Sequence, residues 1–318
     1  MKFFIDQHGC AKNQVDGELI MSLLKKKAWE QTFEPSEADL IIVNSCGFIE
    51  SAKTESINAV MSARQMYPKA KILLAGCLAE RYANDLKDDL LEADGFFGNG
   101  KLDEIYKILD PLMKDERPVL VPEQKGVCCG DRDLLLSFPG TAFVKITEGC
   151  NNRCSFCAIP IIRGDLRSRK ADEIIDEIKE LVSKGVYEIN LIGQDLAAYG
   201  TGATDNCFGD GRTHLPNGTP GSEVLSQMDA DSHRLDTDNK KENLCSISVH
   251  HCSSLSDSES GLARLIRMIS QIEGTFVVRL LYIHPDHFNE DILPIMKADS
   301  RFLHYFDIPF QNGDDSIF

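Results

Sequence analysis

The sequence lacks any long apolar run. Nowhere in its 318 residues is there a stretch of the roughly 18 apolar residues that a membrane-spanning helix needs, so we expect no membrane span. The N-terminal segment, Met1 to Cys10, holds one lysine and a short apolar stretch that is interrupted at Asp6. A signal peptide is longer and more apolar than this. We therefore expect a cytoplasmic protein.

Positive charge is also scarce. The chain has 34 Lys and Arg residues against 50 Asp and Glu residues, which gives a formal net charge of −16. Nucleic acids are polyanions that this average charge repels, although a local basic patch can override the average. A basic protein is attracted instead. The charge therefore favours a protein partner over a nucleic-acid partner.

Cysteine, in contrast, is abundant, with 11 residues in the chain. Structural disulfides are rare in a reducing compartment, so metal binding or catalysis explains so many cysteines better. Paired CxxC units, which are typical of structural zinc sites, are missing from the sequence. Six of the cysteines fall into two patterned sets, and these two sets are the main candidates for function.

The first part of the chain, residues 1–125, alternates between apolar strand-like runs and amphipathic helices. Strands are predicted at Lys2–Ile5, Leu40–Val43, Lys71–Ala75 and Gly95–Phe97, with helices near Val15–Lys27, Ser51–Met66, Ala79–Leu91 and Leu102–Leu109. Strands that alternate with helices of this length indicate a parallel sheet covered on both faces. The predicted fold class is α/β, beginning with an open parallel sheet.

A connector at 126–140, marked by Gly126, Gly130 and Pro139, leads to a second α/β unit at 141–318. Strands are predicted there at Thr141–Thr147, Tyr187–Ile192, Thr275–Ile283 and His304–Ile308, with helices at Ala171–Lys184 and Gly261–Glu273. Residues from about 201 to 260 are rich in Gly, Asp and Ser and poor in large apolar residues. Because such a composition does not offset the entropy of ordering the chain, we expect a disordered insertion there.

The first cysteine set is Cys150, Cys154 and Cys157, directly after a predicted strand. Three thiolates this close together on a loop can hold one 4Fe–4S cluster, and without a fourth local cysteine one iron stays open to another ligand. S-adenosylmethionine suits that iron, because its amino and carboxylate groups can chelate it. Three unligated thiols are the alternative, which this specific spacing disfavours.

The second set is Cys10, Cys46 and Cys77, each of which follows one of the first three predicted strands. The carboxyl ends of parallel strands lie at one edge of the sheet, where open α/β folds build their sites. We therefore expect these thiols to lie together and bind a metal centre. Three separate buried cysteines are the alternative, since free cysteine is often buried. The repeated placement at strand ends favours ligation.

The CxxxCxxC form of the first set, with the aromatic Phe156 before its last cysteine, resembles the radical S-adenosylmethionine (SAM) superfamily. The resemblance implies a partial (β/α) barrel, a 4Fe–4S cluster held by the three cysteines, and cleavage of SAM into a 5′-deoxyadenosyl radical. It also makes Phe156 a candidate for cofactor binding, and Gln194 and Asp195, after the next strand, candidates to line the SAM pocket. Their alternative role is to cap a loop.

The sequence motifs around the second set resemble those of the methylthiotransferase family within that superfamily. They are Gly9-Cys10-Ala11-Lys12-Asn13, Asn44-Ser45-Cys46-Gly47-Phe48 and Gly76-Cys77-Leu78-Ala79-Glu80. The resemblance implies an auxiliary 4Fe–4S cluster at Cys10, Cys46 and Cys77 that supplies or carries sulfur. It therefore implies two 4Fe–4S clusters and SAM as cofactors. Asn13 and Asn44 either hydrogen-bond the cluster sulfurs or hold loops.

The family has one branch that modifies an adenosine of tRNA and one that modifies an aspartate of a ribosomal protein. The stretches Cys46–Lys53, Ile159–Arg169, Arg279–Pro285 and Asp307–Gln311 resemble the second branch. The expected function is thus insertion of a methylthio group at the β-carbon of an aspartate in a small-subunit ribosomal protein. A tRNA methylthiotransferase and a non-catalytic iron–sulfur protein are the alternatives. The sequence identifies neither the sulfur donor nor the electron donor.

Arginines near the first set are candidates to bind a carboxylate. Arg163, Arg167 and Arg169 form a cationic cluster that can pair with the carboxylate of the substrate or of SAM, with a salt-bridge network as the alternative. Arg279, on a strand of the expected barrel, is a similar candidate for cofactor binding.

The chain departs from the family pattern in places. Gly17 stands where a serine is usual, and Asn312 where a histidine is usual. Only about four barrel strands are predicted before Phe318, and no C-terminal β-barrel (TRAM) module follows. We therefore expect a truncated barrel with exposed sheet edges.

Overall fold

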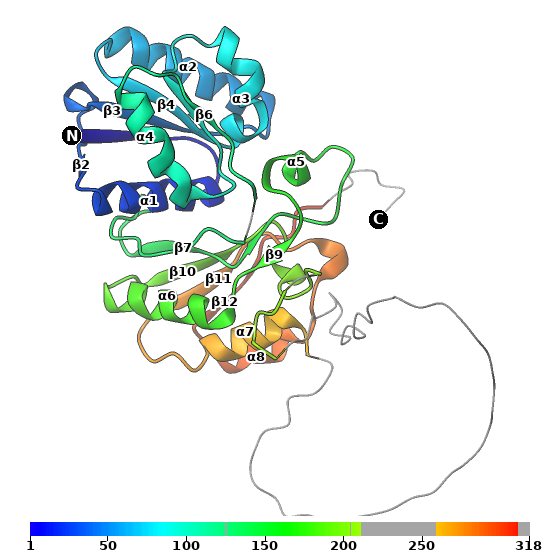
Figure 1. The fold of residues 1–318 in the computed structure, drawn as a ribbon. Coiled ribbons are helices and arrows are strands. Elements are labelled where there is room, and N and C mark those ends of the chain that lie inside the picture. Colours follow the sequence, from blue (N-terminus) through cyan, green and yellow to red (C-terminus); the bar gives the residue numbers. More distant parts are fainter. Residues whose placement is uncertain (125, 204, 211–258, 311–318) are drawn as a thin grey trace, which may run out of the picture.

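The computed structural model describes residues 1–124, 126–203, 205–210 and 259–310, which form two α/β units (Figure 1). The N-terminal unit, coloured blue to teal, lies against the second unit, coloured green to red. Each unit is built on a parallel sheet, so the expected fold class is confirmed. Helix α1 (Ala11–Lys26) lies along the boundary and contacts β7 (Thr141–Lys145) of the second unit.

The first sheet has six strands in the order β2-β1-β3-β4-β5-β6, and all neighbouring pairs are parallel. The strands are β1 (Lys2–Gln7), β2 (Glu30–Gln31), β3 (Leu40–Ser45), β4 (Lys71–Gly76), β5 (Gly95–Phe97) and β6 (Val119–Leu120). Sequence patterns did not predict β2 and β6, because two residues are too few to show a period. The register pairs Gln7 with Asn44 and Asn44 with Ala75, so the carboxyl ends of β1, β3 and β4 lie side by side.

Helices cover both faces of this sheet. Besides α1 they are η1 (Pro35–Glu37), α2 (Glu50–Met66), α3 (Cys77–Asp89), η2 (Leu102–Ile105) and α4 (Tyr106–Met113). Successive strand residues point to opposite faces. Leu40 and Ile42 therefore pack with α1 and α4, whereas Ile41 and Val43 pack with α2 and α3. The helix predicted over Leu102–Leu109 divides into η2 and α4.

The second sheet has four parallel strands in the order β12-β11-β10-β7, which is the order of the chain, as in part of a (β/α) barrel. Besides β7, the strands are β10 (Glu188–Ile192), β11 (Val277–Leu280) and β12 (Phe302–Phe306). The helical segments of this unit are α5 (Ile159–Arg163), α6 (Ala171–Ser183), η3 (Leu196–Ala198), α7 (Gly261–Ile269), η4 (Pro285–His287) and α8 (Ile292–Ala298). Ile178 of α6, Leu265 of α7 and Ile295 of α8 pack in one core with Val144 and Leu191.

The strand predicted over Thr141–Thr147 divides in two. After β7 the chain leaves the sheet as β8 (Thr147–Glu148), which pairs antiparallel with β9 (Arg167–Ser168). This two-stranded ribbon joins the two ends of the segment 149–166, which contains the first cysteine set. The short helix α5 inside that segment was not predicted, because five residues carry too little periodicity.

The first residues of the expected insertion pack against the second unit. The backbone N–H of Ala171 donates to the Cys207 carbonyl oxygen at 2.8 Å, and that of Ser168 donates to Asp205 Oδ1 at 3.0 Å. The rest of the insertion, together with Asn312, lies outside the described residues. Within the described ranges no helix is both long and apolar enough to cross a membrane.

Candidate functional site

Cys10, Cys46 and Cys77 lie at the carboxyl edge of the first sheet. Cys10 directly precedes α1, Cys46 directly follows β3, and Cys77 is the first residue of α3. Two glycines let their loops approach. A Cβ on Gly9 would lie 3.1 Å from the Cys46 Cβ, and a Cβ on Gly47 would lie 2.6 Å from the Cys77 carbonyl oxygen. The three loops therefore meet at one edge of the sheet.

Two buried asparagines tie these loops together. Asn13 Nδ2 donates to the carbonyl oxygens of His8, Asn44 and Ser45 at 2.8, 3.1 and 3.1 Å. Asn44 Nδ2 in turn donates to the Asn13 carbonyl oxygen at 2.7 Å. Asn13 Oδ1 also lies 3.8 Å from the Cys77 Sγ. Both amides thus hold the loops, and Asn13 in addition contacts a sulfur.

Two hydrogen-bond donors approach the Cys77 sulfur, whereas Asn13 Oδ1 can only accept from it. Asn99 Nδ2 lies 3.3 Å and Arg163 Nη2 lies 3.2 Å from Sγ. Burial raises the pKa of the Cys77 thiol to about 11, although the Arg163 charge acts to lower it. A neutral thiol sulfur is a weak acceptor, whereas N–H groups around a metal-bound sulfur are a common outer shell. The donor set therefore fits a thiolate that binds iron.

A lysine links this edge to the second unit. Desolvation alone would raise the pKa of Cys10, but the charges of Lys12 and Arg163 outweigh it and the pKa is lowered. Lys12 Nζ donates to the Gly193 carbonyl oxygen at 2.6 Å and lies 3.9 Å from the ring centroid of Tyr282. Burial lowers the pKa of Lys12 to about 8. The Cys10 loop is thereby tied to the residues that follow β10.

The first cysteine set lies on the loop between β8 and α5. The backbone N–H of Cys150 donates to the Gly164 carbonyl oxygen at 3.1 Å, which closes the loop. Burial raises the pKa of Cys150, and the charges of Asp195, Cys157 and Cys154 add to the rise. No three Cys, His, Asp or Glu side chains in the described part of the chain share a single-ion site. Thiolates on a 4Fe–4S cluster bind different irons and stand further apart.

Asp195 makes hydrogen bonds to η3, to η4 and to the first-set loop, where Asn152 Nδ2 donates to its Oδ2 at 3.4 Å. Its Oδ1 accepts from the backbone N–H groups of Ala197 and His284 at 3.2 and 3.1 Å, and its Oδ2 lies 2.6 Å from His287 Nδ1. The hydrogen bond to this carboxylate raises the pKa of His287. Asp195 therefore caps η3, as the loop-capping alternative expects, and it also positions His284 and His287.

The other three expected cofactor-binding residues differ in their surroundings. Gln194 Nε2 is buried and has no hydrogen-bond partner among the described residues. Phe156 is 71% exposed. Arg279 forms an ion pair with Glu188 at 2.9 Å and lies 5.0 Å from the ring centroid of Tyr305. Of the three residues, Gln194 is therefore the one whose buried side-chain N–H group is available to donate a hydrogen bond to a ligand.

The arginines expected to face a carboxylate of the substrate or of SAM are engaged within the chain. Arg169 pairs with Glu177 at 2.5 Å, and Arg167 donates to backbone carbonyl oxygens, including that of Gly126 at 2.7 Å. Arg163 contacts two carboxylates of the chain. The salt-bridge alternative therefore describes Arg163 and Arg169, although both are buried rather than solvated.

Arg163 belongs to a buried ring of four charges between the units. Lys145 Nζ lies 2.5 Å from Asp16 and 2.7 Å from Glu148, and Arg163 lies 2.8 Å from each of the same carboxylates. Burial would raise the pKa of Glu148, but the Arg163 and Lys145 charges outweigh it and lower the pKa to about 2. Asp16, Lys145 and Glu148 were not singled out from the sequence. A lysine inside the apolar strand β7 was the available signal.

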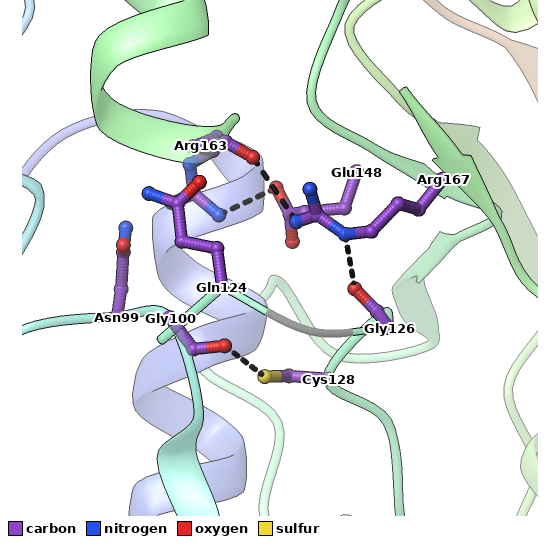
Figure 2. A pocket seen from close by; sticks show the side chains of 8 residues that line it. All are labelled: Asn99, Gly100, Gln124, Gly126, Cys128, Glu148, Arg163 and Arg167. Atoms are coloured by element: carbon purple, nitrogen blue, oxygen red, sulfur yellow. Dashed lines mark hydrogen bonds and ion pairs between the residues drawn. The ribbon is translucent and has the colours of Figure 1, made fainter. Parts of the chain in front are cut away.

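A polar pocket adjoins this ring (Figure 2). It is lined by Asn99, Gly100, Gln124, Gly126, Cys128, Glu148, Arg163 and Arg167. Asn99 and Arg163, in its wall, are the two residues that donate to the Cys77 sulfur. The pocket therefore lies beside the second cysteine set.

The two cysteine sets adjoin across the boundary between the units. Cys77 packs with Ala158 and Ile162 in one buried apolar cluster. Ala158 directly follows Cys157 in the sequence. A ligand candidate of the second set and the end of the first-set loop thus belong to one buried cluster.

Comparison with known families agrees with this architecture. Residues 2–98 match the Uncharacterized protein family UPF0004, and residues 144–308 match the Radical SAM superfamily. The second match spans more than half of the chain, so the chain belongs to the radical SAM superfamily. The expected 4Fe–4S and SAM cofactors are those of this superfamily.

The resemblance to methylthiotransferases is confirmed by curated relatives. The chain is 53% identical over 320 residues to the ribosomal protein uS12 methylthiotransferase RimO of Treponema denticola and 34% identical over 319 residues to that of Acetivibrio thermocellus. These matches cover 98% and 97% of this chain, and the chain spans 59% of each relative's length.

Among solved structures, the radical S-adenosylmethionine methyltransferase TsrM from Kitasatospora setae superposes with a TM-score of 0.56 at 10% identity. The match covers 99% of this chain and 60% of that one. At this identity the likeness shows the fold alone.

Proposed function

We propose that this chain is a radical SAM methylthiotransferase that modifies the β-carbon of an aspartate in a small-subunit ribosomal protein. In this proposal Cys150, Cys154 and Cys157 hold the cluster that binds SAM, whereas Cys10, Cys46 and Cys77 hold the auxiliary cluster. The buried cluster that Cys77 shares with Ala158, next to Cys157, and with Ile162 carries the proposal. Sulfur insertion needs a radical source and a sulfur source near one substrate carbon, and a shared cluster between Cys77 and the end of the first-set loop supports that arrangement.

Bound SAM and its cluster supply the 5′-deoxyadenosyl radical, and the chain supplies orientation and exclusion of water. The unused Gln194 Nε2 is a donor for a polar group of SAM. Asp195 holds the backbone at Ala197 and His284, which shapes the rim of that pocket. Arg279 becomes available for the cofactor only if it leaves Glu188. We therefore assign Gln194 a direct role and Asp195 a positioning role.

The protein substrate is supported by charge and by the named relatives. A net charge of −16 attracts a basic ribosomal protein and opposes a polyanionic tRNA. The relatives at 53% and 34% identity are named as uS12 methylthiotransferases. Since that substrate is made and assembled in the cytoplasm, we place the enzyme there.

Iron and sulfide analysis of anaerobically prepared protein tests the two-cluster assignment. We expect about eight irons per chain, and about four after replacement of either cysteine set. Cys77→Ser should lose iron, whereas Cys129→Ser, at an exposed cysteine outside both sets, should keep it. About four irons in the intact chain would refute the auxiliary cluster.

The substrate is tested by mass spectrometry of ribosomal proteins and tRNA from a strain that lacks the gene. We expect loss of the methylthio group from the aspartate and no change in tRNA. Loss from tRNA alone would assign the chain to the other branch. Failure of the purified, iron-loaded protein to form 5′-deoxyadenosine from SAM would instead favour a non-catalytic iron–sulfur protein.

A further inference from the structure

The Cys77 sulfur receives its two N–H donors from different units. Asn99 follows β5 in the N-terminal unit, and its Nδ2 lies 3.3 Å from Sγ. Arg163 ends α5 in the second unit, six residues after Cys157, and its Nη2 lies 3.2 Å from Sγ. A cation carried by the SAM-binding unit thus contacts a thiol of the other cysteine set.

Both donors are held in place. Arg163 is buried, and its guanidinium is fixed by Asp16 and Glu148, each at 2.8 Å. Asn99 is also buried, in the wall of the pocket in Figure 2. Turning the guanidinium away from the sulfur would break two buried ion pairs, and breaking such pairs is strongly unfavourable. The two ion pairs therefore hold the Arg163 guanidinium against the sulfur.

Such contacts change how readily an iron–sulfur cluster accepts an electron. One-electron reduction adds negative charge to the cluster and its thiolates. Hydrogen bonds to the sulfurs and a nearby cation stabilise that added charge, so they raise the reduction potential. Burial amplifies the effect, because solvent screens the interaction less.

We propose that Arg163 and Asn99 tune the auxiliary cluster, raising its reduction potential by hydrogen-bonding the Cys77 thiolate. This inference rests on the proposed function, which makes Cys77 a ligand of that cluster. Arg163 and Asn99 are positioning residues that act through the ligand sulfur. Because Arg163 belongs to the second unit, the potential of the auxiliary cluster depends on the contact between the units.

The test isolates the auxiliary cluster in the full chain. The starting protein carries Cys150→Ala, Cys154→Ala and Cys157→Ala, and its iron content is measured first. A redox titration with a low-potential one-electron reductant, followed by electron paramagnetic resonance, then gives the midpoint potential. Asn99→Leu removes one donor without disturbing an ion pair. Arg163→Met combined with Asp16→Asn removes the other donor while keeping the buried charge balanced.

The matched control is Arg167→Gln. Arg167 lines the same pocket, but its side chain donates to the backbone carbonyl oxygens of Gly126, Asp165 and Arg163 and not to a sulfur. We expect the midpoint potential to fall in the Asn99 variant and fall further in the Arg163 double variant, with iron content retained. In Arg167→Gln it should stay unchanged.

The outcomes separate the inference from the proposed function. If both the Asn99 variant and the Arg163 double variant keep their iron and their midpoint potential is unchanged, the inference is overturned. The assignment of the auxiliary cluster to Cys10, Cys46 and Cys77 is then unaffected. An equal fall in Arg167→Gln would also overturn it, because the pocket's overall charge and not the sulfur contact would then set the potential. A starting protein without about four irons would overturn the cluster assignment and the inference together.

Discussion

Replacing Lys145 by methionine should strongly destabilise the chain. Lys145 and Arg163 are the two cations that neutralise the buried carboxylates Asp16 and Glu148. Lys145→Met keeps a similar shape but leaves two carboxylates with one cation, so one negative charge is buried without compensation. Removing one partner of a buried ion pair costs about 3–5 kcal/mol.

Urea unfolding followed by circular dichroism measures this loss. With a urea dependence of about 2 kcal/mol per molar, the midpoint should fall by roughly 2 M. The midpoint is the better measure, because two units need not unfold in one step. Lys184→Met is the control. Lys184 pairs with Glu180 near the surface, and such pairs contribute about 0–1 kcal/mol.

A double variant that restores the charge balance can be compared with Lys145→Met. Adding Asp16→Asn to Lys145→Met leaves one cation and one carboxylate in the ring, so more than half of the lost stability should return. Two results would refute the reasoning. One is a Lys145→Met loss no larger than that of the Lys184 control, and the other is a double variant no more stable than the single one.

The free energy of unfolding of Glu148→Gln should approach that of the parent protein as the pH falls from 4.5 towards 2, because the pKa of Glu148 is lowered to about 2 and the parent loses this stabilising charge over that range. Urea unfolding at these pH values should show that the parent loses about 3 kcal/mol more of its free energy of unfolding than the variant does. Gly47→Ala should lower the iron content of the auxiliary site, since its Cβ would lie 2.6 Å from the Cys77 carbonyl oxygen, whereas Gly185→Ala, with open space around it, should not. Asp195→Asn should lower the NMR titration midpoint of His287 towards 6.5, because the Asp195 carboxylate raises that pKa, and an unchanged midpoint would contradict the 2.6 Å contact.

The elements that determine the fold class could be read from the sequence because their patterns are local. The apolar runs ending at Val43 and Ala75 are long enough to mark strands, and parallel strands bring their carboxyl ends together. The positions of Cys46 and Cys77 at one edge follow from that rule. The strands β2 and β6 and the helix α5 were missed, because two to five residues show no period.

The partners of charged side chains could not be read in the same way. For Arg163 the sequence left two roles open, a carboxylate of the substrate or of SAM and a salt-bridge network, and the structure pairs it with Asp16, which is 147 residues away in the sequence. Nothing local distinguishes an arginine that binds a ligand from one that closes a domain boundary. The roles of Asn13 and Asn44 likewise depended on which carbonyl oxygens their loops bring near.

The separation in sequence between the ring's members has a consequence during synthesis. Asp16 leaves the ribosome 129 residues before Lys145 and 147 residues before Arg163. At the usual rate of translation this delay is on the order of ten seconds, which is ample time for the first sheet to fold alone. During that interval the Asp16 face of α1 is hydrated and charged, so it discourages wrong association. Arrival of the second unit then covers it with matched cations.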